Sequence, residues 1–202
     1  MKLVSFSAEV NEDKCTGCGI CARVCPTLSI RVESGLARVD TNTCAGCGAC
    51  VERCPLDAVK LVSLEIPRML GIDPVSVDRQ KLVEICRKAK IHPEQIVCFC
   101  TSTRAEEVVA AILTGAKSPE EISRVTGVRT GCKTECIQPV LRLLYAAGIE
   151  PKPVEGGWQW YGKTVTIWEI SDELKQKYST KGFYFVEDEN LFKKVMEKIQ
   201  NR

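Results

Sequence analysis

The stretch CTGCGICARVCP at residues 15–26 determines how the first part of this chain folds. It places four cysteines with two, two and three residues between them, and a proline follows the last cysteine directly. The stretch CAGCGACVERCP at residues 44–55 repeats this spacing with an offset of 29 residues. The similarity extends further, because residues 10–32 align with residues 39–61. The sequence therefore predicts a duplicated unit with two equivalent cysteine loops.

This spacing is typical of [4Fe–4S] binding, and two copies predict two clusters. In such runs three cysteines bind one cluster while the fourth binds the neighbouring cluster. Zinc sites do not need the third cysteine or the Cys–Pro pair, and disulfides need an oxidising compartment. The expected ligands are Cys15, Cys18, Cys21 and Cys54 for the first cluster, and Cys44, Cys47, Cys50 and Cys25 for the second.

Residues 1–64 resemble a dicluster bacterial-type ferredoxin over its whole length, without a departure in cysteine spacing. The glycines between the cysteines are repeated too, and we expect positive φ angles there, which let the backbone approach a cluster. Two apolar residues in equivalent positions, Ile30 and Val59, are expected to shield the clusters from water. The repeated glycines are Gly17 and Gly19 in the first copy, and Gly46 and Gly48 in the second.

A second set of cysteines lies in the middle of the chain as a C-x-C pair and a C-x3-C pair. The residues between the pairs predict helices, with a capping box from Thr103 to Glu106 and a second start at Ser118. A third helix is expected to begin near Gly131 and end at Gly148. This arrangement would bring both pairs to one end of a helical bundle. The pairs are Cys98 with Cys100, and Cys132 with Cys136.

Residues 91–148 resemble the [2Fe–2S] domain of bacterioferritin-associated ferredoxin. The usual pattern in that family ends in C-x2-C, whereas this chain has Lys133, Thr134 and Glu135 between its last two cysteines. The resemblance implies that Cys98, Cys100, Cys132 and Cys136 bind a [2Fe–2S] cluster. Zinc, or an empty or transient thiol site, remains an alternative for these four residues.

The remaining segments carry no ligand candidates. Residues 65–77 contain two prolines and a glycine and predict a linker, and residues 78–90 predict a helix that buries Cys86 as a small apolar side chain. The single histidine, His92, is expected to be an ordinary loop or helix-entry residue. Residues 65–90 are thus a linker and helix between two cluster domains.

Residues 149–202 hold nine of the twelve aromatic residues of the chain. The pattern predicts a hairpin over residues 158–168, a helix that starts at Ser171, a strand at Phe183–Val186 and a final helix with Leu191 to Ile199 on its apolar face. We expect an α+β extension that contacts another subunit. The predicted fold class is α+β, with a ferredoxin-like dicluster domain, a small helical [2Fe–2S] domain and this extension.

Composition excludes several kinds of partner. The net charge is only +2, which favours neither nucleic acid nor an anionic membrane surface. The longest apolar run, Val108 to Leu113, has six residues, far below the roughly 20 that span a bilayer. The first residues lack the apolar segment of a secretory signal, so we expect a cytoplasmic protein without membrane insertion.

The sequence contains no dinucleotide-binding glycine motif, phosphate-binding loop or nucleophile with its base. We therefore expect a non-catalytic electron-transfer chain. The chain resembles the iron–sulfur subunits of archaeal flavin-dependent dehydrogenase complexes, which implies a hetero-oligomer with FAD in a partner subunit. The alternatives are an independent ferredoxin or iron-handling redox protein, and a ferredoxin fused to a zinc-binding regulatory domain.

Overall fold

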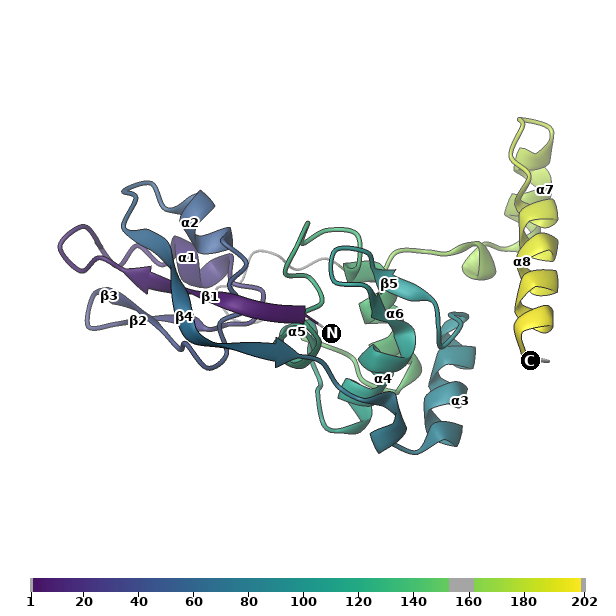
Figure 1. Ribbon diagram of the computed structural model, residues 1–202. Coiled ribbons are helices and arrows are strands. Elements are labelled where there is room, and N and C mark those ends of the chain that lie inside the picture. The colour runs from purple at the N-terminus through teal and green to yellow at the C-terminus, as the bar shows by residue number, and fades with distance from the viewer. Residues whose placement is uncertain (1, 153–161, 201–202) are drawn as a thin grey trace. The chain divides into compact units, whose positions relative to one another are not determined.

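The computed structural model describes residues 2–152 and 162–200. Small sheets and helices alternate along the chain (Figure 1), which confirms the predicted α+β class. The chain divides into two units, Met1–Tyr161 and Gly162–Arg202. The second unit therefore begins later than the extension expected from residue 149. None of the helices in the described ranges is long and apolar enough to cross a lipid bilayer.

Two antiparallel strand pairs accompany the duplicated cysteine loops. Strand β1 (Lys2–Val10) pairs with β4 (Val59–Leu70), and β2 (Ile30–Glu33) pairs with β3 (Leu36–Val39). The short helices α1 (Ile20–Arg23) and α2 (Ala49–Arg53) occupy equivalent positions in the two copies and contact each other. Each carries the third cysteine of its copy, so the predicted internal duplication is confirmed.

Strand β4 continues into the segment that was expected to be a linker. It runs on to Leu70, which pairs with Lys2, so the linker shortens to the residues before α3. The register between the two strands shifts between Val4 and Phe6, and Pro67 lies opposite this irregularity. A proline that cannot donate to the ladder is tolerated at a bulge, and this explains why a proline-containing segment is a strand here.

The rest of the first unit is a helical domain with one apolar core. Leu82, Val108, Ile122, Val140 and Leu144 are completely buried in this core. Cys86 lies in the same core, so its predicted packing role is confirmed. The elements are the 3-10 turn η1 (Pro74–Ser76), helices α3 (Arg79–Ala89), α4 (Ala105–Leu113), α5 (Pro119–Thr126) and α6 (Ile137–Ala146), and the short strands β5 (Ile96–Cys98) and β6 (Thr103–Arg104).

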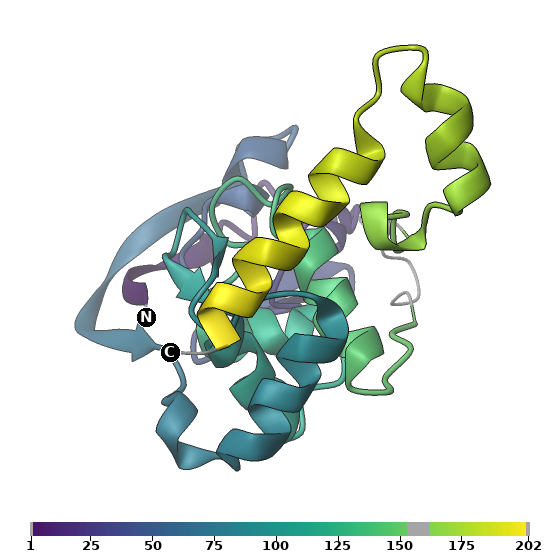
Figure 2. The ribbon, with the colours of Figure 1, turned by 90° about the vertical axis from the view of Figure 1, so that its right-hand side faces the viewer.

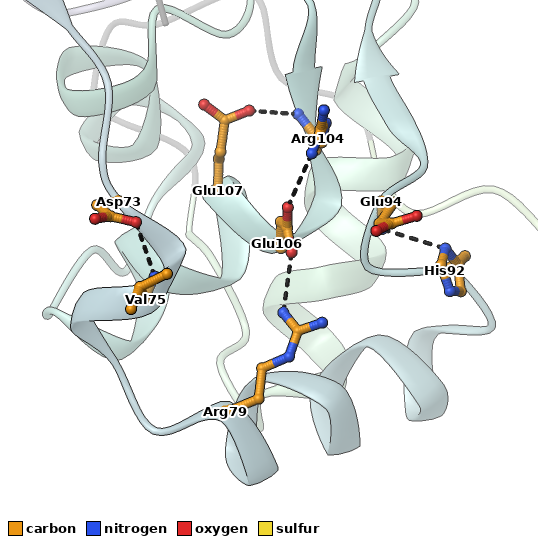
Figure 3. Close-up of polar contacts among 8 residues, drawn as sticks. All are labelled: Asp73, Val75, Arg79, His92, Glu94, Arg104, Glu106 and Glu107. Atoms are coloured by element: carbon orange, nitrogen blue, oxygen red, sulfur yellow. Dashed lines mark hydrogen bonds and ion pairs between the residues drawn. The ribbon is translucent and has the colours of Figure 1, made fainter. Parts of the chain in front are cut away.

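The start of α4 differs from the predicted capping box. Thr103 lies in β6 with its hydroxyl 2.7 Å from that of Thr101, and the helix begins at Ala105. The carboxylate of Glu107 therefore accepts the hydrogen bond from the Arg104 N–H at 2.8 Å, the contact expected of Glu106 (Figure 3). Glu106 instead forms an ion pair at 2.9 Å with Arg79, which connects α4 to α3.

Two other local predictions are confirmed. Ser118 accepts a hydrogen bond from the N–H of Glu121 at the start of α5, and Gly127 ends this helix in the left-handed conformation with φ 75°. His92 lies in the loop between α3 and β5, where its Nδ1 accepts a hydrogen bond from the Glu94 N–H at 3.3 Å (Figure 3).

The second unit contains the 3-10 turn η2 (Ile167–Glu169) and helices α7 (Asp172–Ser179) and α8 (Phe185–Gln200). Helix α8 packs against α7 and η2 (Figures 1 and 2), with the Trp168 and Phe192 rings 6.3 Å apart. Ser171 caps α7 as predicted. The predicted strand at Phe183–Val186 is wrong, because α8 already begins at Phe185.

The predicted hairpin over residues 158–168 falls partly on residues 153–161, which lie outside the described residues. Its second arm is wrong, since residues 162–166 form no strand and residues 167–169 form a 3-10 turn. The described part of the extension is therefore helices and loops.

Candidate metal centres

The first candidate site is a pocket beside α1. Cys15, Cys18, Cys21 and Cys54 all line it, so the fourth cysteine comes from the other copy of the repeat. Apolar residues complete the wall, and Val59 is among them. The structure thus brings together the four residues expected to bind the first cluster. Their binding of one cluster stays a prediction.

The second candidate site gathers Cys44, Cys47 and Cys50 with Cys25 from the first copy. Burial raises the pKa of Cys50 to about 12, and the neighbouring charges of Cys47, Cys25 and Cys44 act in the same direction. Burial also raises the pKa of Cys47, again with Cys25 as a neighbour. Four thiolates cannot form side by side without compensating positive charge. Metal binding would supply this charge and release the protons.

The two sites have matching hydrogen bonds to sulfur. The Ser29 N–H donates to Cys25 Sγ at 3.2 Å, and the Ala58 N–H donates to Cys54 Sγ at the same distance. Hydrogen bonds of this kind favour the thiolate and tune cluster potential. The sites differ in two further contacts. The Thr27 hydroxyl lies 3.5 Å from Cys25 Sγ at the second site, where leucine occupies the equivalent position 56 of the other copy, and the Ala37 N–H donates to Cys15 Sγ at 3.4 Å at the first site.

Glycine is required in both cysteine loops for a steric reason. Gly17 has φ 65°, and a Cβ there would lie 2.2 Å from the carbonyl oxygen of Gly35. Gly46 has φ 59°, and its Cβ would lie 2.5 Å from the carbonyl oxygen of Phe6. The predicted positive φ angles are confirmed, and the close approach in each loop is to a neighbouring backbone segment. The buried Ile30 and Val59 pack among the cysteines, as expected of shielding residues.

The third candidate site lies in the helical domain. Cys98 ends β5, and Cys136 directly precedes α6; both are buried. Their thiols are hydrogen-bonded, which lowers the pKa of Cys98 to about 5 and raises the pKa of Cys136. Cys100 and Cys132 are exposed, and the Cys132 N–H donates to Cys100 Sγ at 3.3 Å. The four predicted residues therefore meet at one place, with one edge open to solvent.

The extra residue of the C-x3-C pair is accommodated in a loop. Helix α6 begins at Ile137, later than the predicted start near Gly131, so Cys132 precedes the helix. The backbone N–H groups of Thr134 and Glu135 lower the pKa of Cys132. Cys136 still meets Cys98, and the insertion therefore does not separate the two pairs.

The arrangement of these thiols is compatible with clusters of several iron ions. A polynuclear cluster spreads its four thiolates around several irons, whereas one zinc ion draws four ligands to a single point. The thiol-only donor sets, the N–H···S bonds and the glycine-lined loops suit iron–sulfur clusters.

Sequence patterns did not indicate Arg129. Its side chain is 2% exposed and forms a buried ion pair with Glu120 at 2.8 Å, while its backbone N–H lowers the pKa values of Cys98 and Cys136. It has φ 67°, a conformation that a residue with a side chain rarely adopts. Arg129 therefore contributes a backbone N–H to the third site, from a loop after α5 that carries no recognisable sequence motif.

Gly131 offers a test of the third site. A Cβ at this position would lie 2.3 Å from the Cβ of Cys100 and 2.8 Å from its Sγ. Gly131→Ala should therefore displace Cys100, at a cost of about 1–3 kcal/mol for overpacking, and strongly reduce the [2Fe–2S] signal in electron paramagnetic resonance (EPR). Gly162→Ala is the matched control, because nothing lies within 4 Å of its added Cβ. Equal [2Fe–2S] signals in both variants would contradict the close contact.

Comparison with protein families identifies two segments. The model of the 4Fe-4S dicluster domain matches residues 7–55, and the model of the BFD-like [2Fe-2S] binding domain matches residues 96–146. No curated protein shows significant sequence similarity to the chain. The two matched segments contain the three candidate sites. The chain thus carries iron–sulfur domains of both kinds, and such domains transfer electrons.

Proposed function

We propose that this chain is the iron–sulfur subunit of a multisubunit flavin-dependent dehydrogenase. The observation that carries the proposal is the grouping of twelve cysteines into three separate thiol sites within one unit. A cluster held by four protein thiolates supplies one-electron transfer and leaves no protein-provided position for substrate. Substrate oxidation then belongs to a partner that holds FAD.

The chain's own residues have three tasks in this function. The thiols bind the clusters, and the N–H groups of Ser29 and Ala58 stabilise the charge on sulfur. Buried apolar residues such as Ile30 and Val59 exclude water from the two four-iron sites. The exposed edge at Cys100 and Cys132 gives the third site a surface at which electrons can enter or leave.

Metal content tests the cofactors. Two [4Fe–4S] clusters and one [2Fe–2S] cluster correspond to about ten irons per chain. Anaerobic purification followed by iron, sulfide and zinc analysis should give this value. About eight irons with one zinc would contradict the [2Fe–2S] assignment and support a zinc-binding domain at the third site.

Copurification tests the complex. Isolated from its native cells under mild conditions, the chain should be accompanied by a stoichiometric flavoprotein that bleaches when substrate is added. A monomeric chain, or one bound to a ferritin-like iron store, would contradict the dehydrogenase proposal. It would instead support the independent iron-handling protein.

A further inference from the structure

Basic side chains of the N-terminal strand and of the helical domain meet where the dicluster domain contacts the helical domain. Lys2, at the start of β1, donates a hydrogen bond from Nζ to the Thr130 hydroxyl at 2.7 Å. Its aliphatic stem packs on Gly127, where an added Cβ would lie 3.0 Å from the Lys2 Cβ. Burial lowers the pKa of the Lys2 ammonium, whereas the negative charges of Cys47, Cys44 and Cys98 act in the opposite direction. Lys2 therefore lies at the boundary of the two domains, near thiols of the second and third sites.

Lys133 belongs to the helical domain and lies at the same boundary with the dicluster domain. It is the first of the three residues between Cys132 and Cys136, and its φ of 68° is rare for a residue with a side chain. Its Nζ lies 3.3 Å from the carboxylate of Glu52 on α2. Its charge also acts on Cys47. Glu52 is 67% exposed and Lys133 only 25%, so solvent screens the carboxylate more than the ammonium.

Arg124 on α5 makes the third contact. Its Nε donates to the carbonyl oxygen of Thr27 at 2.6 Å, and the Thr27 hydroxyl lies beside Cys25 Sγ. Lys133 and Arg124 thus contact the segments that hold the second set of cysteines, and Lys2 lies at the same domain boundary. The pocket of the first set is lined by residues 15–21, 37, 54–56, 58 and 59, and none of the three basic residues is among them.

We propose that the Cys44, Cys47, Cys50 and Cys25 site is the one that exchanges electrons with the third site, and that Lys2 and Lys133 raise its reduction potential above that of the other four-iron site. The inference rests on the proposed electron-transfer function. It adds the order of the centres: the first site is the outer one, the second is central, and the third follows. Each step moves one electron between two centres, with no bond formed and no proton transferred.

The physical basis is charge and hydrogen bonding. Adding an electron makes a cluster more negative, so nearby positive charge favours the reduced form. Lys2 and Lys133 lie near the second site, and Thr27 adds a hydroxyl contact that leucine at position 56 cannot provide at the first. The first site has a contact of its own, from the Ala37 N–H to Cys15 Sγ at 3.4 Å, so the lysine charges decide the order of the two potentials. The lysines are positioning residues for electron transfer, since they bind no metal.

Lys2→Gln and Lys133→Gln test this assignment. In redox titrations followed by EPR, each substitution should reduce the equilibrium constant for reduction of the higher-potential four-iron cluster about tenfold, or about 59 mV for one electron. The lower-potential four-iron cluster should not change. Lys60→Gln is the control, because Lys60 lies on β4 and pairs with Glu9 on the exposed surface. Equal shifts of both four-iron potentials, or no shift of either, would overturn the proposal.

A measurement on the unmodified chain gives a second test. Two nearby paramagnetic centres speed each other's spin relaxation, so the [2Fe–2S] signal should relax faster once the higher-potential four-iron cluster is reduced. Acceleration that appears only when the lower-potential cluster is reduced would overturn the order of centres. A chain with no [2Fe–2S] signal would instead overturn the proposed function, so the two failures are distinguishable.

Discussion

Cys25→Ser should remove the cluster held by Cys44, Cys47 and Cys50 and leave the cluster at Cys15, Cys18 and Cys21 in place. The reason is spatial, since Cys25 lies among the second set of thiols although it belongs to the first stretch of sequence. The expected loss is about four irons of about ten. Iron analysis and the disappearance of one four-iron EPR signal measure it.

Cys54→Ser is the matched reciprocal variant, because Cys54 lines the first pocket and accepts an equivalent N–H bond. It should remove the other four-iron signal. Cys86→Ala controls for the loss of a buried cysteine outside the sites and should retain all iron. Selective loss of the first cluster in Cys25→Ser would refute the crossed ligation.

The cysteine sites were the most predictable part of the molecule. The candidate ligands lie within short stretches whose spacing restricts the local backbone, and the crossed ligation was expected from the known pattern of such runs. The structure places Cys54 with the first set of thiols and Cys25 with the second. Helix caps such as Ser118 and Ser171 were predictable for the same reason, because a cap depends on neighbours two or three residues away. Interactions between residues close in the sequence determine both the cysteine loops and the helix caps.

Predictions failed where local patterns allow two structures. Phe183 to Val186 is aromatic and β-branched, which favours a strand. The chain nevertheless begins α8 at Phe185, and Glu187 and Asp188 in its first turn are favourable at a helix N-terminus. Pro67 similarly indicated a linker, whereas the partner strand β1 tolerates it at a register shift. The pairing of β4 with β1 therefore determines the strand conformation around Pro67.

The contacts of Lys2, Arg124 and Lys133 were not predictable. Each joins residues far apart in the sequence, such as Arg124 with Thr27, and no motif relates them. The buried pair of Arg129 and Glu120 is similar, because only the folded loop shows that both side chains are enclosed. Sequence patterns therefore identify the cysteine ligands more readily than the charged residues that influence the reduction potentials of the sites.

The second unit should be needed for partner binding and not for cluster binding. Its helix α8 exposes Leu191 and Val195, which are 59% and 44% exposed and lie one turn apart on the same face. Removal of the unit in a chain that ends at Tyr161 should leave all iron in place, because every predicted ligand precedes this residue. The same chain should no longer retain the flavoprotein in a pull-down.

Point substitutions test the proposed contact without deleting the helix. Leu191→Glu combined with Val195→Glu should abolish the complex, because central apolar contacts can contribute about 2 kcal/mol or more each, and about 4 kcal/mol weakens binding about a thousandfold. Lys194→Glu is the control, since Lys194 is also exposed on α8 but carries no apolar side chain. Circular dichroism should show unchanged helix content in both full-length variants. Retention of the flavoprotein by the double variant and by the shortened chain would place the subunit contact on the cluster domains, with the exposed edge at Cys100 and Cys132 as the next surface to test.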